Sequence, residues 1–421
     1  MNENKKKIGV YPATMGTQSF GGLQVRCSEP GSEPVEGSSV YITAPGNPND
    51  VIEQLTTDSS GLTKRIELPA PPLEYSQEPN AEQPYSNYDI LVEATGFEDI
   101  TFSNVEILPD VYAEQDAILT PAPFPGAEEV YVIEPHTLYA EYPPKIPEDE
   151  IKPVIPTGEI ILDSVVVPEF VIVHDGPPNS PAQNYWIGFR DYIKNVASSE
   201  IYATWPEATI YANILAILSF TLNRVYTEWY RNQGYNFTIT SSTAYDQKWI
   251  NGRNIYQNIG LAVDSIFVNY LSRPNILQPI LSQYCDGNRV QCPNWMSQWG
   301  SKFLGDQGNS TIEILRYYYG NDIYIDTAQE VSGVPSSWPG TNLTIGSTSD
   351  SVRTIQQQLN RIAQSYPAIP IIAVDGIFGP RTEEAVRTFQ EIFNLPANGI
   401  VDMPTWYKIS YVFVGVARLA E

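Results

Sequence analysis

The N-terminal part of the chain alternates short apolar runs with turn-forming residues. Between residues 20 and 120, runs with β-branched or alternating apolar residues are separated at close intervals by Gly, Pro, Asn and Asp. This pattern is typical of short strands joined by tight turns. We therefore predict an all-β module over residues 1–120. Its expected strands lie within FGGLQVRC, SSVYITA, KRIELPA, YDILVEAT and VEILPD.

Proline dominates the next part of the chain. Residues 121–183 contain 13 of the 35 prolines. Proline fixes φ and lacks a backbone N–H, so this density disfavours helices and central strands. We predict an extended connector with one β-like run, ILDSVVVPEFVIVHDG. An exposed, acidic connector is also where a protease would cut.

Helical periodicity characterises residues 184–330. Apolar residues recur every three or four positions along ATIYANILAILSFTLNRVYTEWYR, which predicts a long helix at the centre of a core. A β-type run, YNFTITSSTAYDQKW, follows it. Further helices are predicted near NIGLAVDSIFVNYLSR and over residues 310–319. We assign this region to a central α+β domain, so the whole chain is expected to be multidomain α+β.

The last unit follows a short linker at residues 331–345 and spans residues 346–421. Apolar residues at helical spacing in SDSVRTIQQQLNRIA predict a first helix. Two turn-then-helix segments follow, VDGIFGPRTEEAVRTFQ and GIVDMPTW. These pieces strongly resemble the peptidoglycan-binding domain 1 family. The resemblance implies a three-helix bundle that associates with peptidoglycan.

Charge and hydropathy limit the partners of the chain. Its 421 residues have a net charge of −25, which argues against nucleic acid as a partner. Residues 1–164 hold 28 acidic and 8 basic residues, so the surplus belongs to the front part. No run of eighteen apolar residues is present, and we expect no membrane span. The start of the chain lacks the apolar core of a secretory signal.

Few residues are available to hold a metal ion. The chain has three cysteines and two histidines, whereas a zinc site needs about four ligands. Cys285 and Cys292 lie close together in YCDGNRVQC, where a disulfide and two free thiols are both open. His136 and His174 lie far upstream. We expect no metal and no cofactor.

Two carboxylates in VASSEIYATWPEATIYANILAILSF are candidates for acid chemistry. Thr204, Pro206 and Glu207 fit a capping box at the start of the long helix, which gives Glu207 a structural role. Glu200 precedes that cap in a Ser-Ser-Glu turn among apolar neighbours. Partial desolvation there would raise its pKa and suit a general acid. An ordinary loop glutamate is the alternative interpretation.

The sequence around Glu200 resembles the entry motif of the SpoIID-like lytic transglycosylases. The resemblance places the catalytic acid of that family on Glu200. SSTAYDQKWING and MSQWGSKFLGDQGNSTIEILRYYYG resemble two further motifs of the family, although the family's arginine is replaced in LSF at 218–220. The implied glycan-groove residues are Ser242, Thr243, Gln247 and Gln298, with Trp299 and Tyr319 as possible stacking partners for sugars.

The order of the parts resembles the clostridial spore cortex-lytic enzymes of the SleC type. The front module itself resembles a carboxypeptidase-regulatory or prealbumin-like sandwich. Together these resemblances imply a spore zymogen whose residues 1 to about 160 are removed by a subtilisin-like protease. The mature part would be a lytic transglycosylase acting on the peptidoglycan glycan strands of the cortex. A non-catalytic wall-binding structural protein and an N-acetylmuramoyl-L-alanine amidase are the alternatives.

Overall fold

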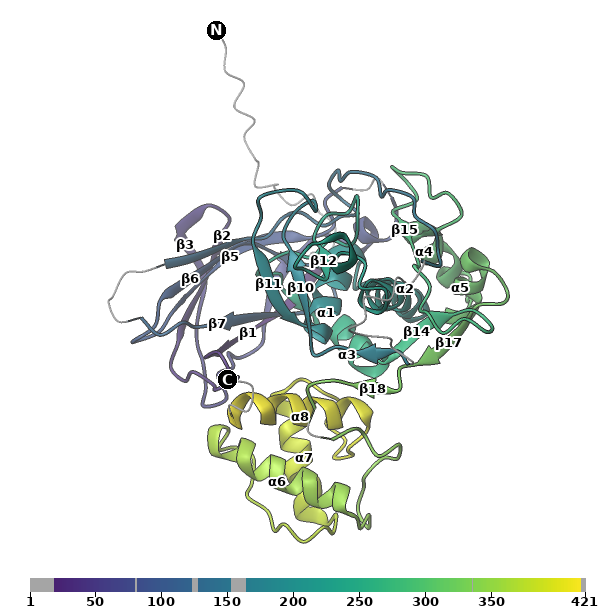
Figure 1. Cartoon of the computed structure of the whole chain (residues 1–421). Helices are drawn as coiled ribbons and strands as arrows, with labels where there is room; N and C mark the ends of the chain where they lie inside the picture. Colours follow the sequence, from purple (N-terminus) through teal and green to yellow (C-terminus); the bar gives the residue numbers. More distant parts are fainter. Residues whose placement is uncertain (1–18, 80–81, 123–127, 153–163, 335, 418–421) are drawn as a thin grey trace.

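The structure is a computed structural model that describes residues 19–79, 82–122, 128–152, 164–334 and 336–417. This part of the chain is mixed α+β, with several sheets and eight α-helices. In Figure 1 the N-terminal sheets lie beside a central region built around helix α2 (Glu207–Tyr226), and the C-terminal helices lie below both. The expectation of a multidomain α+β chain is met at this level.

Two sheets form the N-terminal module. One has the strand order β13-β7-β1-β4, in which β13 (Ile255–Tyr256) comes from the central region, and the other has the order β3-β2-β5-β6-β8. Their inner faces supply a core of Val, Ile and Leu side chains. The elements of the module are β1 (Ser19–Ser28), β2 (Ser39–Ala44), β3 (Asn47–Thr56), β4 (Ile66–Ala70), the 3-10 helix η1 (Leu73–Ser76), β5 (Ser86–Glu93), β6 (Asp99–Ile107), β7 (Tyr112–Ile118) and β8 (Glu128–Val132).

Three of these strands were not predicted. Strand β3 is an edge strand with mostly exposed side chains, so its sequence NPNDVIEQLT shows little apolar alternation. Strand β7 turns small or polar side chains inward, among them Ala113, Gln115 and Ala117. Strand β8 falls within the proline-rich connector, which we expected to hold a single β-like run. It adds to the sheet edge beside β6, the position that a proline-rich neighbourhood tolerates.

The N-terminal module shares a sheet with the central region. Strand β13 (Ile255–Tyr256) belongs to the central region and pairs antiparallel with β7, with Ile255 opposite Glu114. This pairing continues the first sheet across the boundary between the two parts. The front module is therefore joined to the central region by sheet pairing as well as by the connector.

Helix α2 forms the centre of the central region. It spans Glu207–Tyr226, as the periodicity predicted, and most of its residues are buried. Among the helices in the described ranges, α2 alone is long and apolar enough to cross a bilayer. However, 83% of its most apolar window is buried inside the protein. The other elements are β9 (Val166–Val167), β10 (Phe170–His174), β11 (Asn184–Gly188), α1 (Phe189–Glu200), η2 (Arg231–Gln233), β12 (Ile239–Thr240), α3 (Gln257–Ile266), β14 (Asn269–Ser272), β15 (Tyr284–Cys285), β16 (Met296–Ser297), α4 (Gln298–Asp306), α5 (Thr311–Tyr319), β17 (Tyr324–Thr327) and β18 (Glu330–Val331).

The start of α2 corrects the predicted capping box. Glu207 is the first residue of the helix, and neither its side chain nor that of Thr204 caps it. Thr204 instead shares a 2.7 Å hydrogen bond with Ser76 of the N-terminal module. A capping box does occur at α5, where Ser310 and Glu313 satisfy each other's backbone groups. The helix predicted over residues 310–319 is thus confirmed.

Glu200 also lies in a different element from the one expected. It is the last residue of helix α1, not part of a turn before α2. The apolar residues of FRDYIKNVASSE recur at helical spacing and are buried, which explains the helix. Because α1 ends at Glu200, the carboxyl group sits at the junction of two buried helices.

Three helices form the C-terminal unit: α6 (Asp350–Ser365), α7 (Pro380–Ile392) and α8 (Met403–Ala417). Pro380 occupies the first turn of α7, as predicted. The unit also contacts the N-terminal module. Arg26 donates a 2.8 Å hydrogen bond to the carbonyl of Ile392, and the Tyr366 hydroxyl donates one of 2.6 Å to the carbonyl of Ser32.

Candidate active site

The carboxyl group of Glu200 is buried and held by two donors. The residue is 3% exposed. One carboxylate oxygen accepts a 2.7 Å hydrogen bond from the backbone N–H of Lys248, and the other accepts a 2.5 Å bond from the Tyr284 hydroxyl. Gln298 donates to the backbone carbonyl of Glu200 at 3.1 Å. Segments far apart in the sequence therefore fix the position of this one side chain.

The environment of Glu200 favours a protonated carboxyl group. Burial raises its pKa above the ordinary value of 4.5. The ammonium of Lys145, the backbone N–H of Lys248 and the Tyr284 hydroxyl oppose that effect, because each stabilises the ionised form. A carboxyl group with a raised pKa retains its proton to higher pH than an ordinary glutamate does and can give that proton to a leaving oxygen.

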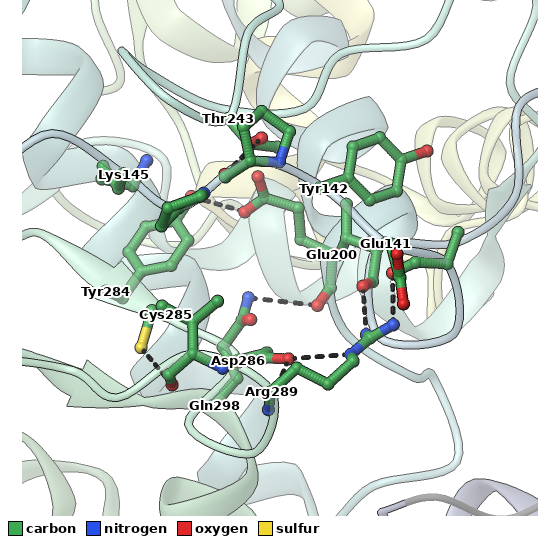
Figure 2. Close-up of a pocket in the computed structure, with 15 residues that line it drawn as sticks. Glu141, Tyr142, Lys145, Glu200, Thr243, Tyr284, Cys285, Asp286, Arg289 and Gln298 are labelled. Atoms are coloured by element: carbon green, nitrogen blue, oxygen red, sulfur yellow. Dashed lines mark hydrogen bonds and ion pairs between the residues drawn. The ribbon is translucent and has the colours of Figure 1, made fainter.

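Glu200 lines a cavity of about 440 Å³. Figure 2 shows its carboxyl group lying between Tyr284 on one side and Tyr142 on the other. The central region contributes Thr243, Tyr284, Arg289 and Gln298 to the walls. Residues 140–145 of the connector also line the cavity. The cavity thus lies between the central region and the connector.

The connector is tied to the central region on both sides of the cavity. Arg289 donates to the carbonyl oxygens of Thr137 and Tyr139 at 2.7 and 2.9 Å, and also to that of Ala140. Across the cavity, Thr243 donates to the Pro143 carbonyl at 3.2 Å. These bonds hold the connector over the cavity that contains Glu200.

Lys145 projects from the connector into the site. Its ammonium lies 4.8 Å from the ring centre of Phe220 and 5.0 Å from that of Tyr284. It also donates to the backbone carbonyl of Asp246. These cation–π contacts and the hydrogen bond place a positive charge next to Glu200.

Of the groove residues inferred from the sequence, the structure brings Thr243 and Gln298 to the cavity together with Glu200. Gln247 is buried below it and hydrogen-bonds Tyr192 and Thr221. The remaining three do not line this cavity. Ser242 accepts bonds from the next turn through its backbone carbonyl, Trp299 packs against Trp205, and Tyr319 donates to the carbonyl of Gln283.

The residues of the site that sequence reasoning missed include Lys145 of the connector and, in the central region, Tyr284, Lys248 and Arg289. Tyr284 directly precedes the cysteine segment, but nothing in its local pattern indicates a contact with Glu200, 84 positions away. Lys248 contributes a backbone N–H, a group that any residue type supplies. Arg289 lies in the CDGNRVQC loop, where a lone arginine among polar residues is a weak signal that could have been noted.

Among the described residues, four ion pairs join the part of the chain before residue 153 to the central region. Glu106 pairs with Arg253 at 2.5 Å, and both side chains are buried. The acidic surplus of the front part of the chain is therefore used, in part, to neutralise cations of the central region. The other pairs are Glu134–Lys248 at 2.8 Å, Glu148–Arg224 at 2.5 Å and Glu150–Arg273 at 2.8 Å.

Cys285 and Cys292 form a disulfide, which closes the loop that carries Arg289. The alternative of two free thiols at these positions is not what the structure shows. Cys27 is a buried free thiol in the N-terminal module. Within the described ranges, no group of three or more His, Cys, Asp or Glu side chains is placed to hold a metal ion.

Comparisons with known proteins concern a minor part of the chain. Residues 348–409 match the family described as putative peptidoglycan binding domain. A zinc D-Ala-D-Ala carboxypeptidase of Streptomyces albus G is 42% identical over 74 residues, which are 17% of this chain and 27% of that protein. An uncharacterized protein of Kitasatospora aureofaciens is 41% identical over 63 residues, which are 15% of this chain and 49% of that protein.

One solved structure is similar over a part of the chain. The TIE protein of Bacillus anthracis has a TM-score of 0.18 and 14% identity, over 25% of this chain and 17% of that one.

The chain spans about a quarter to a half of the length of the two curated relatives it matches. The family match covers helices α6 and α7 and part of α8, so the C-terminal unit of this chain contains a peptidoglycan-binding domain.

Proposed function

We propose that the chain is the precursor of a peptidoglycan lytic transglycosylase that degrades spore cortex. The observation that carries the proposal is the carboxyl group of Glu200, which is buried, has a raised pKa and faces a cavity. The peptidoglycan-binding domain supports the choice of substrate. The resemblance of three segments around the site to the SpoIID-like enzymes supports the type of reaction.

One carboxyl group is enough for this reaction. In the first step, the protonated Glu200 would donate its proton to the glycosidic oxygen that follows muramic acid, and the bond from that oxygen to the anomeric carbon would break. In the second step, the ionised Glu200 would accept the proton of the C6 hydroxyl while the C6 oxygen bonds to the anomeric carbon. The products are a shortened strand and a 1,6-anhydro sugar, and no water is consumed.

The hydrogen bonds of Glu200 suit both steps. The raised pKa favours the proton-bearing form needed at the start. The Lys248 N–H and the Tyr284 hydroxyl would stabilise the ionised form that exists between the steps. Thr243 and Gln298 are polar side chains on the same cavity and would bind sugar hydroxyls.

The position of the connector supports storage as an inactive precursor. Residues 140–145 occupy one wall of the cavity and would exclude a glycan strand from Glu200. A subtilisin-like protease would release them by cutting between the N-terminal and central parts. The cut expected near residue 160 lies outside the described residues.

The test compares the cut chain with two glutamate variants. The full chain, with a site for a specific protease placed between Lys152 and Ser164, would be purified and then cut. We expect the cut chain to clear cortex suspensions and to release anhydro-muramic products by mass spectrometry. Glu200→Gln should abolish release, whereas Glu207→Gln should not, because Glu207 is exposed on the first turn of α2.

The outcomes separate the competing functions. Reducing-end products without anhydro sugar would point to a hydrolase, and released peptides would point to an amidase. Clearing that is unchanged in Glu200→Gln would remove the catalytic role of this residue. Absence of any product, with wall binding retained, would support a non-catalytic wall-binding protein, the alternative favoured by the missing family arginine at LSF.

A further inference from the structure

Two cations of the central region hold the same stretch of the connector. Lys248 binds Glu134 through its ammonium, which lies 2.8 Å from the carboxylate oxygen, and it also lies 5.3 Å from the ring centre of Tyr142. Arg289 binds the backbone carbonyls of Thr137, Tyr139 and Ala140. The contacts that the two cations make with the connector therefore fall within residues 134–142.

Both cations belong to the surroundings of Glu200. The backbone N–H of Lys248 donates directly to the Glu200 carboxylate, and the side chain of Arg289 lines the cavity. Figure 2 shows Arg289 extending along the side of the cavity below Glu200. The Lys248 residue is only 8% exposed, so the connector and its neighbours shield most of it from water.

The connector segment that these two cations bind in the uncut chain is itself an acidic peptide. Lys248 binds a carboxylate, and Arg289 binds a row of amide carbonyl oxygens with its guanidinium. When residues before 153 leave, both side chains lose these acceptors. Arg289 keeps its ion pair with Asp286 of the same loop, at 3.1 Å. The site would then be open to another peptide that offers the same two kinds of group.

We infer that Lys248 and Arg289 form a binding site for the acidic peptide stems of peptidoglycan. This inference rests on the proposed function, because it places the stem next to the glycan strand at Glu200. The stem carries carboxylates and amide carbonyls and is attached to the same muramic acid whose glycosidic bond would break. Charge-assisted hydrogen bonds of this kind are stronger than neutral ones and orient a ligand. In the uncut chain, residues 134–142 occupy the stem site.

Binding to an inactive variant tests the inference without requiring catalysis. The full chain bearing Glu200→Gln would be purified, cut between Lys152 and Ser164, and titrated with soluble glycan fragments. One set of fragments carries the peptide stem and the other lacks it. We expect the stem to tighten binding about 5- to 10-fold, with a larger gain at low salt. If the N-terminal fragment stays bound, the same ligands are compared by how readily they displace it.

Substitutions then assign the gain to the two cations. Lys248→Gln and Arg289→Gln should each remove most of the gain given by the stem, measured as the ratio between the affinities for the two sets of fragments. Lys248→Gln keeps the backbone N–H that holds residue 200, so this loss would not reflect a disturbed carboxyl group. The matched control is Arg231→Gln, an exposed cation of the same region whose side chain is 54% exposed.

Two results would overturn the inference. One is equal binding of the fragments with and without the stem. The other is a gain that survives both cation substitutions. Failure of the proposed function would look different, since active chain with Glu200 would then give no anhydro product while the preference for the stem persisted.

Discussion

The hydrogen bond between Tyr284 and Glu200 gives a test that does not depend on the function. Tyr284→Phe removes the 2.5 Å bond to a carboxylate oxygen and leaves the bond from the Lys248 N–H in place. A hydrogen bond to an ionised group stabilises a protein by about 1.5–3 kcal/mol, and one between neutral groups by about 0.5–1.5 kcal/mol. The cost of the substitution should therefore depend on whether Glu200 is ionised.

The direction of the pH dependence follows from the pKa of Glu200. Because burial raises that pKa above 4.5 in the folded chain, the contribution of Glu200 to stability is complete below pH 4.5 and declines as the pH rises through the folded pKa. The Tyr284 hydroxyl favours the ionised form and limits this decline. In Tyr284→Phe the folded pKa rises further, so the variant loses more stability than the parent chain as pH increases.

Urea unfolding followed by tryptophan fluorescence measures this effect. At about pH 4 we expect Tyr284→Phe to lower the free energy of unfolding by about 0.5–1.5 kcal/mol, and at about pH 8 by about 1.5–3 kcal/mol. Tyr319→Phe is the matched control. It removes a buried 3.0 Å bond to the neutral carbonyl of Gln283, so its cost should be the same at both values of pH.

A double-mutant cycle provides the refutation. In a Glu200→Gln background, the cost of Tyr284→Phe should become small and independent of pH, because no carboxylate remains to accept the bond. A cost that is equal in both backgrounds would show that the hydroxyl acts elsewhere. A cost that falls with rising pH would contradict the proposed coupling between Tyr284 and the ionised form of Glu200.

Three further predictions concern contacts around the site. Glu106→Gln should lower the free energy of urea unfolding by about 3–5 kcal/mol, because Arg253 stays buried without its counter-charge. Glu150→Gln removes a partly exposed ion pair and should lower it by less than about 1 kcal/mol. Equal losses in the two variants would contradict the role of burial. Replacing Cys285 and Cys292 by serine should lower the free energy of urea unfolding by about 2–3 kcal/mol, because the unfolded chain is no longer constrained by a closed loop. Reduction of the disulfide in the parent chain should lower it by the same amount. Arg289→Ala should speed limited proteolysis within residues 137–145 by about tenfold or more, while Arg231→Ala should leave it unchanged, because only Arg289 binds three carbonyls of that segment.

Elements with a strong local pattern could be predicted from the sequence. Helix α2 follows from its apolar spacing, and α7 follows from Pro380 and the glycine-containing turn before it. Helix α1 was not predicted, although the apolar residues of FRDYIKNVASSE recur at helical spacing, because its two serines are a residue type that favours turns and caps. The capping box assigned to Thr204 failed for a physical reason: Ser76, from another part of the chain, competes for its hydroxyl.

The candidate site could be predicted only where a sequence motif marks it. Glu200, Thr243 and Gln298 lie in motifs of the central region, and the structure brings them to one cavity. The connector wall could not be predicted, because it depends on contacts such as that between Thr243 and Pro143, which are 100 positions apart. Proline density predicts an extended segment, but it carries no information on the surface along which that segment lies.

The contacts of the N-terminal module with two other parts of the chain have a kinetic consequence. It shares a sheet with the central region through β13, and Arg26 and Ser32 contact the C-terminal unit. These contacts are non-covalent and remain intact when the connector is cut. If the chain has the function proposed above, appearance of activity after cutting should therefore show a lag set by the unimolecular release of the module. Adding more protease would shorten the cutting step and leave that lag unchanged.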